Sequence, residues 1–471
     1  MIREINWEEI MRWDEKYLIH TWASAQEYHG LPIAATEGNY LIMPDGTRLL
    51  DFFNQLYCVN AGQRNPYINA RIKEALDRYG FLWDAYTSDY KATAAKLIIE
   101  DLLGKDGWAK KVRFANTGGE AVELACIFAR HFTGKPVIAT REYSYHGYSA
   151  GAGSVTAMLP AKSSISKAEP GVVQSVPGAV VSPTMVVPAP FCYRCSIGHT
   201  YPGCKKKGEK LPCILATERL IRNKGLDQVG AIITETIHGA STIHPPAEYL
   251  PQLRQLTKEL GIVWITDEIL VGCGRTGSWF AYQNYGVVPD IMTVAKGIVN
   301  SQIPASACIV NEEIAAFIDG HRWNHVSTFS GHPIAMAGIV ATLEYMLEHN
   351  LPEKARISGK YLGKRLHELE QKHKSIGLIA GSGQLWQVEL VKDRKTGEPI
   401  IAADRNSDFS GDQSKWPSKV VMYKAIEKGV LIGGFVPNTL RVGASLEVTN
   451  EEIDQAIAAL DYALDFVDAM I

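Results

Sequence analysis

Short apolar runs alternate with amphipathic segments through the middle of the chain. The run at residues 262–266 ends at Asp267-Glu268, and a second run, at 290–295, ends at Lys296-Gly297. Such near-continuous runs are typical of strands in a parallel sheet, because helices cover both of its faces. Further runs of this kind occupy residues 112–115, 137–140, 229–234 and 306–311. With helical segments such as 248–260 between them, they predict an α/β protein with a mostly parallel, doubly wound sheet.

The two ends of the chain differ from this central part. Residues 34–53 have the pattern of a meander, in which Asp45-Gly46 suits a tight turn between strands. Residues 160–190 are rich in Pro, Ser, Val and Gly and predict a long excursion from the sheet. Later patterns predict helices at 353–373, 416–428 and 450–469 and strands at 383–391 and 440–442. We therefore expect a large domain, 66–345, a small α+β domain, 346–471, and an N-terminal segment, 1–65, that joins the small domain.

The composition is that of an ordinary globular enzyme. Of the 471 residues, 46% are hydrophobic and 21% are charged, and the formal net charge is −3. This charge balance gives no reason to expect a nucleic-acid or membrane partner. No run approaches the roughly eighteen apolar residues of a membrane-spanning helix, and residues 1–20 lack the apolar core of a signal peptide. We expect a cytoplasmic protein.

Two carboxylates and a lysine are predicted to lie at the same edge of the sheet. Open α/β sheets bind ligands at the carboxyl ends of their strands, and Glu235, Asp267 and Lys296 each follow a predicted strand. A lysine amine forms a Schiff base with the aldehyde of pyridoxal phosphate, and a carboxylate keeps the pyridine nitrogen of that cofactor protonated. The alternative is that Asp267 caps a helix or binds a metal and that Lys296 is a solvated lysine.

A candidate phosphate site follows the predicted strand at 112–115. The turn Asn116-Thr117-Gly118-Gly119 leads directly into a predicted helix at 120–130. Backbone N–H groups at a helix N-terminus, together with the helix dipole, favour a phosphate. The alternative is a tight strand-to-helix connection without a ligand. The loop 143–147 leaves the next strand with aromatic side chains that suit stacking on a flat cofactor ring.

Taken in order, these segments resemble the class III, fold type I pyridoxal-phosphate aminotransferases, the ω-transaminase group. The resemblance covers essentially the whole chain and rests on fragments in a fixed order: Asn116-Thr117-Gly118-Gly119-Glu120-Ala121, Tyr145-His146-Gly147, Glu235, Asp267-Glu268, Gly274-Arg275-Thr276-Gly277, Pro289-Asp290, Lys296-Gly297, Thr328 and Arg441. It implies the fold of that family, pyridoxal 5'-phosphate as cofactor, and a homodimer or higher homo-oligomer with shared active sites.

The resemblance also implies roles for individual residues. Lys296 binds the cofactor covalently and moves the proton, Asp267 pairs with the ring nitrogen, and Glu235 organises the substrate pocket. The implied contacts of the cofactor's phosphate and ring are Gly118, Gly119, Tyr145, His146 and, reaching the phosphate of the neighbouring subunit, Thr328. The implied substrate contacts are Arg441, which binds a carboxylate as a bidentate fork, and the pocket-lining aromatics Tyr57 and Trp22.

Four cysteines are clustered in the sequence. Cys192 and Cys195 have the spacing of a metal-binding pair, and His199, Cys204 and Cys213 follow within a short distance. A zinc or iron–sulfur site is one interpretation. However, Cys204 and Cys213 are too far apart in sequence to form a second tight pair, so our prediction is a reduced, packed loop without a metal.

These observations predict an aminotransferase that transfers an amino group from an amine, an ω-amino acid or an aminosulfonate to a 2-oxo acid, with pyruvate as the acceptor. Two alternatives keep the cofactor: an aminomutase of the glutamate-1-semialdehyde type and a decarboxylating transaminase. A third alternative, from another class, is a metal-dependent α/β hydrolase that uses Glu235 and Asp267. Leu270 bears on the substrate, because it stands beside the predicted cofactor site where glutamine is common in the family.

Overall fold

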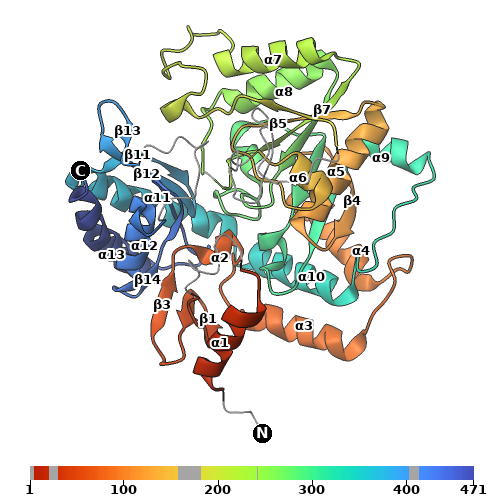
Figure 1. Cartoon of the computed structure of the whole chain (residues 1–471). Coiled ribbons are helices and arrows are strands. Elements are labelled where there is room, and N and C mark those ends of the chain that lie inside the picture. The colour runs from red at the N-terminus through yellow and green to blue at the C-terminus, as the bar shows by residue number, and fades with distance from the viewer. Residues whose placement is uncertain (1–4, 21–29, 158–181, 241, 402–412) are drawn as a thin grey trace.

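The chain forms two α/β parts, termed the first and the second layer, and each has its own strands and helices (Figure 1). The computed structural model describes residues 5–20, 30–157, 182–240, 242–401 and 413–471. The first layer contains a seven-stranded sheet, and the second contains two smaller sheets, one formed by the C-terminal part of the chain and one formed mostly by the N-terminal segment. Glu235, Asp267 and Lys296 lie at the carboxyl edge of the first sheet.

The seven-stranded sheet has the order β4-β10-β9-β8-β7-β5-β6. Its strands are β4 (Ala109–Ala115), β5 (Val137–Arg141), β6 (Thr184–Val187), β7 (Val229–Glu235), β8 (Val263–Asp267), β9 (Ile291–Val294) and β10 (Ser306–Asn311). The neighbouring strands β6, β5, β7, β8 and β9 pair in parallel. By contrast, β10 is antiparallel to both of its neighbours, β4 and β9. The prediction of a mostly parallel sheet is confirmed.

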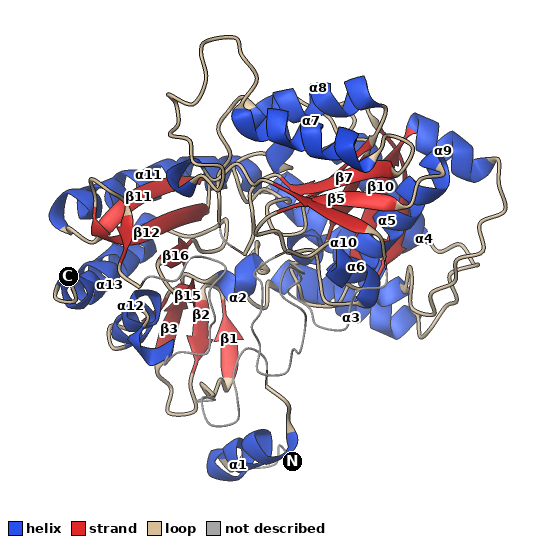
Figure 2. Cartoon of the chain, turned by 45° about the horizontal axis from the view of Figure 1, so that its top comes forward, coloured by secondary structure: helices blue, strands red, loops and turns tan. Residues whose placement is uncertain are grey.

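Helices cover both faces of this sheet (Figure 2). On β8, the side chains of Trp264 and Ile265 point to opposite faces, because successive residues of a strand alternate. Trp264 belongs to the core cluster under α7 (Pro212–Lys224) and α8 (Tyr249–Leu260), and Ile265 belongs to the cluster under α5 (Gly118–Thr133). The remaining helices of this layer are α3 (Pro66–Arg78), α4 (Asp89–Lys96), α6 (Ala150–Ser154), α9 (Glu312–Asp319) and α10 (Pro333–Glu348).

One part of the predicted excursion at 160–190 is wrong. Residues 184–187 form β6, the edge strand of the large sheet, which pairs in parallel with β5. This strand has only four residues and lies among Pro, Ser and Gly residues, so the sequence pattern did not indicate it. Its hydrogen bonds are made with the neighbouring strand β5. Residues 158–181 of the predicted excursion lie outside the described part of the chain.

The second layer packs three helices on an antiparallel sheet of order β11-β12-β16-β15. Its elements are α11 (Leu351–Lys372), β11 (Ile376–Ser382), β12 (Leu385–Asp393), β13 (Glu398–Pro399), α12 (Pro417–Ile426), β14 (Val430–Leu431), β15 (Gly433–Val436), β16 (Thr439–Val442) and α13 (Asn450–Asp468). The strand predicted at 383–391 is confirmed as β12, whereas β11, which pairs with β12 as a hairpin, was not predicted. A Cβ atom on Gly381 would lie 2.3 Å from the Trp386 ring, so packing requires glycine where the sequence signal of a strand is weak.

The N-terminal segment contributes to the second layer. It contains α1 (Trp7–Tyr17), β1 (Ala35–Glu37), β2 (Tyr40–Ile42) and β3 (Arg48–Asp51), of which the strands form the predicted meander. Leu50 of β3 pairs in parallel with Val430 of β14, and both side chains are buried in the core of the second layer. The exact domain boundaries stay a prediction. Within the described residues, none of the helices has the length and apolar character needed to cross a membrane.

Candidate active site

Three of the predicted site residues come together at the carboxyl edge of the large sheet. Glu235 and Asp267 end β7 and β8, which pair in register so that these two residues are neighbours. Lys296 follows β9, the next strand, and begins a short 3-10 helix, η4 (Lys296–Val299). Both carboxylates are buried, whereas Lys296 is half-buried. Lys296 has a φ angle of +48°, an uncommon conformation for a non-glycine residue and one often found at functional sites.

The carboxylate of Asp267 is held from two sides. Its Oδ2 atom lies 2.7 Å from Nδ1 of His146, and its Oδ1 atom accepts a hydrogen bond of 3.0 Å from the backbone N–H of Ile269. His146 is itself buried, and its Nε2 atom has no hydrogen-bond partner among the described residues. A carboxylate with such fixed partners keeps one orientation, as required of a group that faces a bound cation.

The N-terminus of α5 forms a close-packed glycine cradle. Thr117 caps the helix and accepts a hydrogen bond from the backbone N–H of Glu120. The N–H groups before it in the first turn have no partner within the helix, as at any helix start. A Cβ atom on Gly118 would lie 3.0 Å from Ile269, and one on Gly147 would lie 2.9 Å from Cα of Gly119. Glycine therefore allows the loop after β5 to approach the helix start, and the phosphate-binding role of this helix start stays a prediction.

Glu235 and Arg441 are connected through the backbone of Gly239. The Oε2 atom of Glu235 accepts a hydrogen bond of 2.5 Å from the N–H of Gly239, and Arg441 Nη1 donates a bond of 2.9 Å to the carbonyl oxygen of Gly239. The Oε1 atom of Glu235 accepts a third bond from the N–H of Tyr145. Burial and the charge of Asp267 raise the pKa of Glu235, although His146 opposes the shift.

An aromatic side chain lies beside Arg441, and a second one packs against the first. Its guanidinium lies 5.3 Å from the ring of Phe53, and the Phe53 ring meets Tyr57 edge-on at 6.3 Å. Burial lowers the pKa of Arg441, whereas Tyr57 and Glu235 oppose this shift. Tyr57 is completely buried, and its hydroxyl group has no hydrogen-bond partner among the described residues. The structure thus places a cation, a carboxylate and a free phenol in one region beside the sheet edge.

The remaining predicted site residues differ in burial and surroundings. Tyr145 is half-buried next to Tyr148, at a distance of 5.4 Å between ring centroids, and burial raises the pKa of Tyr145 to about 12. Thr328 is exposed, and its neighbour Ser327 accepts a weak hydrogen bond of 3.4 Å from Asn116. Trp22 lies outside the described residues.

Three residues without a predicted role contact the predicted site residues or lie beside them. Gly239 stands in a segment without a recognisable motif, and Phe53 ends the predicted meander at 34–53, a pattern that indicates strands and not a contact with Arg441. Arg275 belongs to the fragment Gly274-Arg275-Thr276-Gly277, which carries part of the family resemblance but does not indicate what Arg275 contacts. All three are recognised through their distances to Glu235, Arg441 and Tyr57.

The four clustered cysteines do meet in the structure. Cys192, Cys195, Cys204 and Cys213 line one small cavity together with His199. Burial raises the pKa of Cys192 to about 11 and that of Cys213 to about 12, as expected for packed thiols. That this cluster holds no metal stays a prediction.

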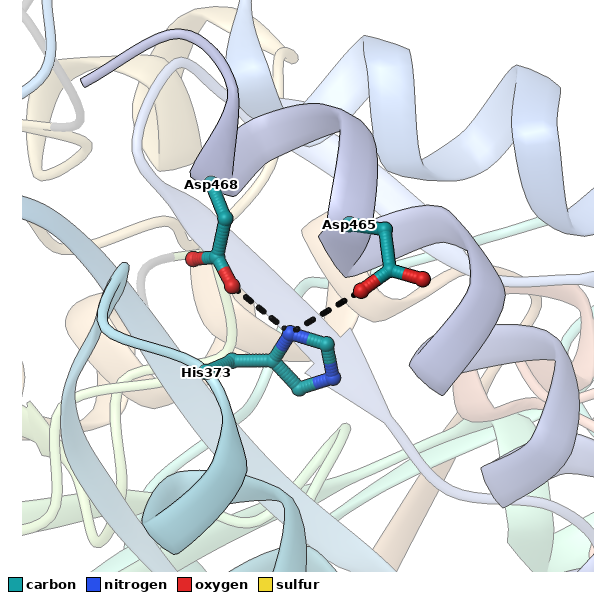
Figure 3. A group of neighbouring side chains, drawn as sticks. All are labelled: His373, Asp465 and Asp468. Carbon is teal, nitrogen blue, oxygen red and sulfur yellow. Dashed lines mark hydrogen bonds and ion pairs between the residues drawn. The ribbon is translucent and has the colours of Figure 1, made fainter.

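Among the described residues, the side chains that come close enough together to bind a metal are elsewhere. His373, Asp465 and Asp468 place ligand atoms within 4.8 Å of one another in the second layer (Figure 3). The imidazole of His373 already contacts Asp468 through Nδ1 and Asp461 through Nε2, at 2.8 Å each. We interpret these contacts as structural, because they join the end of α11 to α13. The group belongs to the second layer and is far in sequence from the edge of the large sheet.

The model of the class III aminotransferases matches residues 23–464, and the chain belongs to this family. The enzyme is therefore a pyridoxal-phosphate-dependent aminotransferase of fold type I. The aminomutase, decarboxylating and hydrolase alternatives are not favoured.

Solved structures support this assignment over the whole chain. An S-selective transaminase from Bacillus megaterium is 51% identical, with a TM-score of 0.92 and coverage of 99% of both chains. An S-selective transaminase from Arthrobacter sp., with alanine bound, is 50% identical, with a TM-score of 0.91 and the same coverage. A taurine–pyruvate aminotransferase from Bilophila wadsworthia is 28% identical over 484 aligned positions, which cover 98% of both chains.

Proposed function

We propose that the enzyme transfers an amino group from an amine, an ω-amino acid or an aminosulfonate to a 2-oxo acid, with pyruvate as the acceptor. The observation that carries this proposal is the buried guanidinium of Arg441, linked through Gly239 to Glu235 at the sheet edge. A 2-oxo acid brings a carboxylate that needs a cation once water is removed. The Arthrobacter relative with alanine bound supports pyruvate as the acceptor, because pyruvate is converted to alanine when it accepts an amino group.

The residues at the sheet edge fit the cofactor. When bound, pyridoxal phosphate supplies an aldehyde that condenses with amines and a ring that accepts electrons from the substrate. Lys296 would bind that aldehyde through Nζ and would take and return the proton of the reacting carbon. Asp267, held by His146, would keep a proton on the ring nitrogen. The glycine cradle at Gly118 would bind the phosphate through backbone N–H groups.

The substrate pocket would be formed by groups that the structure brings together. Arg441 would bind the acceptor carboxylate as a bidentate fork, and Glu235 on the other side of Gly239 would balance its charge when the bound amine has no carboxylate. Tyr145 would lie against the cofactor ring. Tyr57 would line the pocket near Arg441, and a similar role for Trp22 stays a prediction.

We also propose that the working unit is a homodimer or a higher homo-oligomer. Thr328 is exposed at the surface of a single chain, so its predicted phosphate contact requires a second copy. Large apolar side chains are exposed around it, and Phe81 and Phe329 lie 6.0 Å apart at 55% and 58% exposure. An exposed aromatic patch of this kind is typical of a protein interface. The cytoplasmic location stays a prediction.

Absorption spectra and product analysis test the proposed function together. The purified enzyme should be yellow and should form alanine from pyruvate in the presence of an amine donor such as 1-phenylethylamine or taurine. Lys296→Ala should lose both turnover and the borohydride-reducible bond to the cofactor, whereas Lys354→Ala, at an exposed position, should keep both. Alanine formation by Lys296→Ala at the normal rate, or no alanine from any donor with the wild type, would contradict the proposal.

A further inference from the structure

Arg275 is a completely buried arginine whose guanidinium has no ion pair among the described residues. It donates instead to four oxygen atoms. Nη2 donates to the side-chain oxygens of Asn54, at 2.7 Å, and Asn60, and Nη1 donates to the backbone carbonyls of Ala444 and Gln384. Since a buried cation is costly without compensation, these four contacts must be supplied by the folded chain. The arginine therefore joins segments that are remote in sequence.

Two of these segments carry the proposed substrate contacts. Asn54 and Asn60 stand on either side of Tyr57, and Ala444 follows Arg441 by three residues. The Arg275 guanidinium also lies 5.3 Å from the Tyr57 ring, within the range of a cation–π contact. The Arg275 side chain thus contacts both Tyr57 and the segment that follows Arg441 at the end of β16, which are the two proposed contacts near the acceptor carboxylate.

The segment before Tyr57 needs such support. The four consecutive residues 54–57 all have positive φ angles, between 47° and 64°, although none of them is glycine. A left-handed turn of this length is unfavourable for L-residues and persists only when its surroundings hold it. Asn54 bonds to the Val59 carbonyl at 3.0 Å, which closes the turn, and the bond from Arg275 fixes the same amide from outside.

We infer that Arg275 is a positioning residue for the acceptor half of the reaction: it holds Tyr57 and the end of β16 in the arrangement that binds a 2-oxo acid. This inference rests on the proposed function. The guanidinium contacts none of Lys296, Asp267 and Gly118 among its described hydrogen bonds, so the cofactor chemistry does not depend on it directly. Burial lowers the pKa of Arg275 to about 10, so the side chain stays charged at neutral pH.

Steady-state and half-reaction kinetics of Arg275→Lys and Arg275→Met test this inference. Lysine keeps the positive charge but lacks the planar set of N–H donors of the guanidinium. Methionine keeps much of the side-chain volume without the charge. We expect KM for the 2-oxo acid to rise about tenfold or more in both variants, with the amine half-reaction within about threefold of the wild type. Arg254→Lys is the matched control, because Arg254 is a half-buried arginine that pairs with Asp290 outside the pocket.

A second variant separates positioning from folding. Asn54→Ala removes one acceptor of the guanidinium together with the bond that closes the turn, and it leaves Arg275 in place, so it should raise KM for the 2-oxo acid in the same direction, with an unchanged cofactor absorption spectrum. Unchanged KM in Asn54→Ala, or equal losses in both half-reactions of Arg275→Lys, would overturn the inference. The kinetics use whichever 2-oxo acid the wild type accepts, so a failure of pyruvate as acceptor would contradict the proposed function without deciding the role of Arg275.

Discussion

His146 Nδ1 and Asp267 Oδ2 lie 2.7 Å apart, and both side chains are buried. This contact joins the loop after β5 to the end of β8, which are 121 residues apart in sequence. Because the second carboxylate oxygen is held by the N–H of Ile269, the Asp267 side chain has little freedom to rotate. The geometry is that of a fixed anion prepared for a cationic partner.

Asp267→Asn should keep the fold and lose most of the transaminase activity, about a hundredfold or more in kcat. The amide retains hydrogen bonding but has no negative charge, so it does not keep a ring nitrogen protonated. Circular dichroism checks the fold, and initial rates with saturating pyridoxal phosphate check the activity. Treatment with EDTA should leave the wild type unchanged. Loss of activity to EDTA together with indifference to pyridoxal phosphate would indicate the hydrolase alternative.

Arg441→Ala should weaken the use of pyruvate by roughly ten- to a hundredfold in kcat/KM, since a hydrogen bond to a charged group contributes about 1.5–3 kcal/mol. An amine donor without a carboxylate should lose much less in its own half-reaction. Stopped-flow spectra of the two half-reactions measure the difference. Equal losses in both would assign Arg441 to the fold or to the cofactor, and the carboxylate-binding role would then belong to another residue.

Glu268 should make stability depend on pH. Burial raises the pKa of Glu268 to about 7, although its carboxylate accepts bonds from Thr236 and from the N–H groups of Ala281 and Tyr282. Because the folded pKa exceeds the ordinary value of 4.5, the stabilisation is fully present below pH 4.5 and is lost as the pH rises through 7.

Glu268→Gln removes this titration and keeps one acceptor oxygen. The free energy of unfolding of the variant, relative to that of the wild type, should therefore increase between pH 5 and pH 8, by at most about 3 kcal/mol. Urea titrations of both proteins at the two pH values measure the change. A difference between the two proteins that is constant with pH would show that Glu268 is already ionised at pH 5.

The exposed aromatic patch should be an interface. Phe329→Lys should shift the enzyme towards monomers and reduce its activity, because it introduces a charge where Phe329 and Phe81 would be buried between subunits. Light scattering at several concentrations gives the mass. Ile357→Lys is the control, since Ile357 is 59% exposed on α11 in the other layer. A fully active monomer would refute the shared active site.

The sequence by itself determined the large sheet and the residues at its carboxyl edge. Asp267 and Lys296 end local apolar runs, and Gly118 stands between a strand pattern and a helix pattern. Such signals lie within a few residues, because the burial of a strand and the start of a helix are recorded in the side chains of that segment. The same signals predicted most of the strands and helices around them, but they did not predict β6, α7 and α9 in the first layer or β11, β14 and β15 in the second.

Only the tertiary structure decided how the substrate side of the site is built. Arg441 reaches Gly239 across 202 residues, and Arg275 reaches Asn54 across 221. The left-handed turn that carries Tyr57 contains no glycine, so its conformation comes from the contacts around it and not from local preference. Contacts between distant segments depend on how the two layers pack, and a single sequence records this packing in no local pattern.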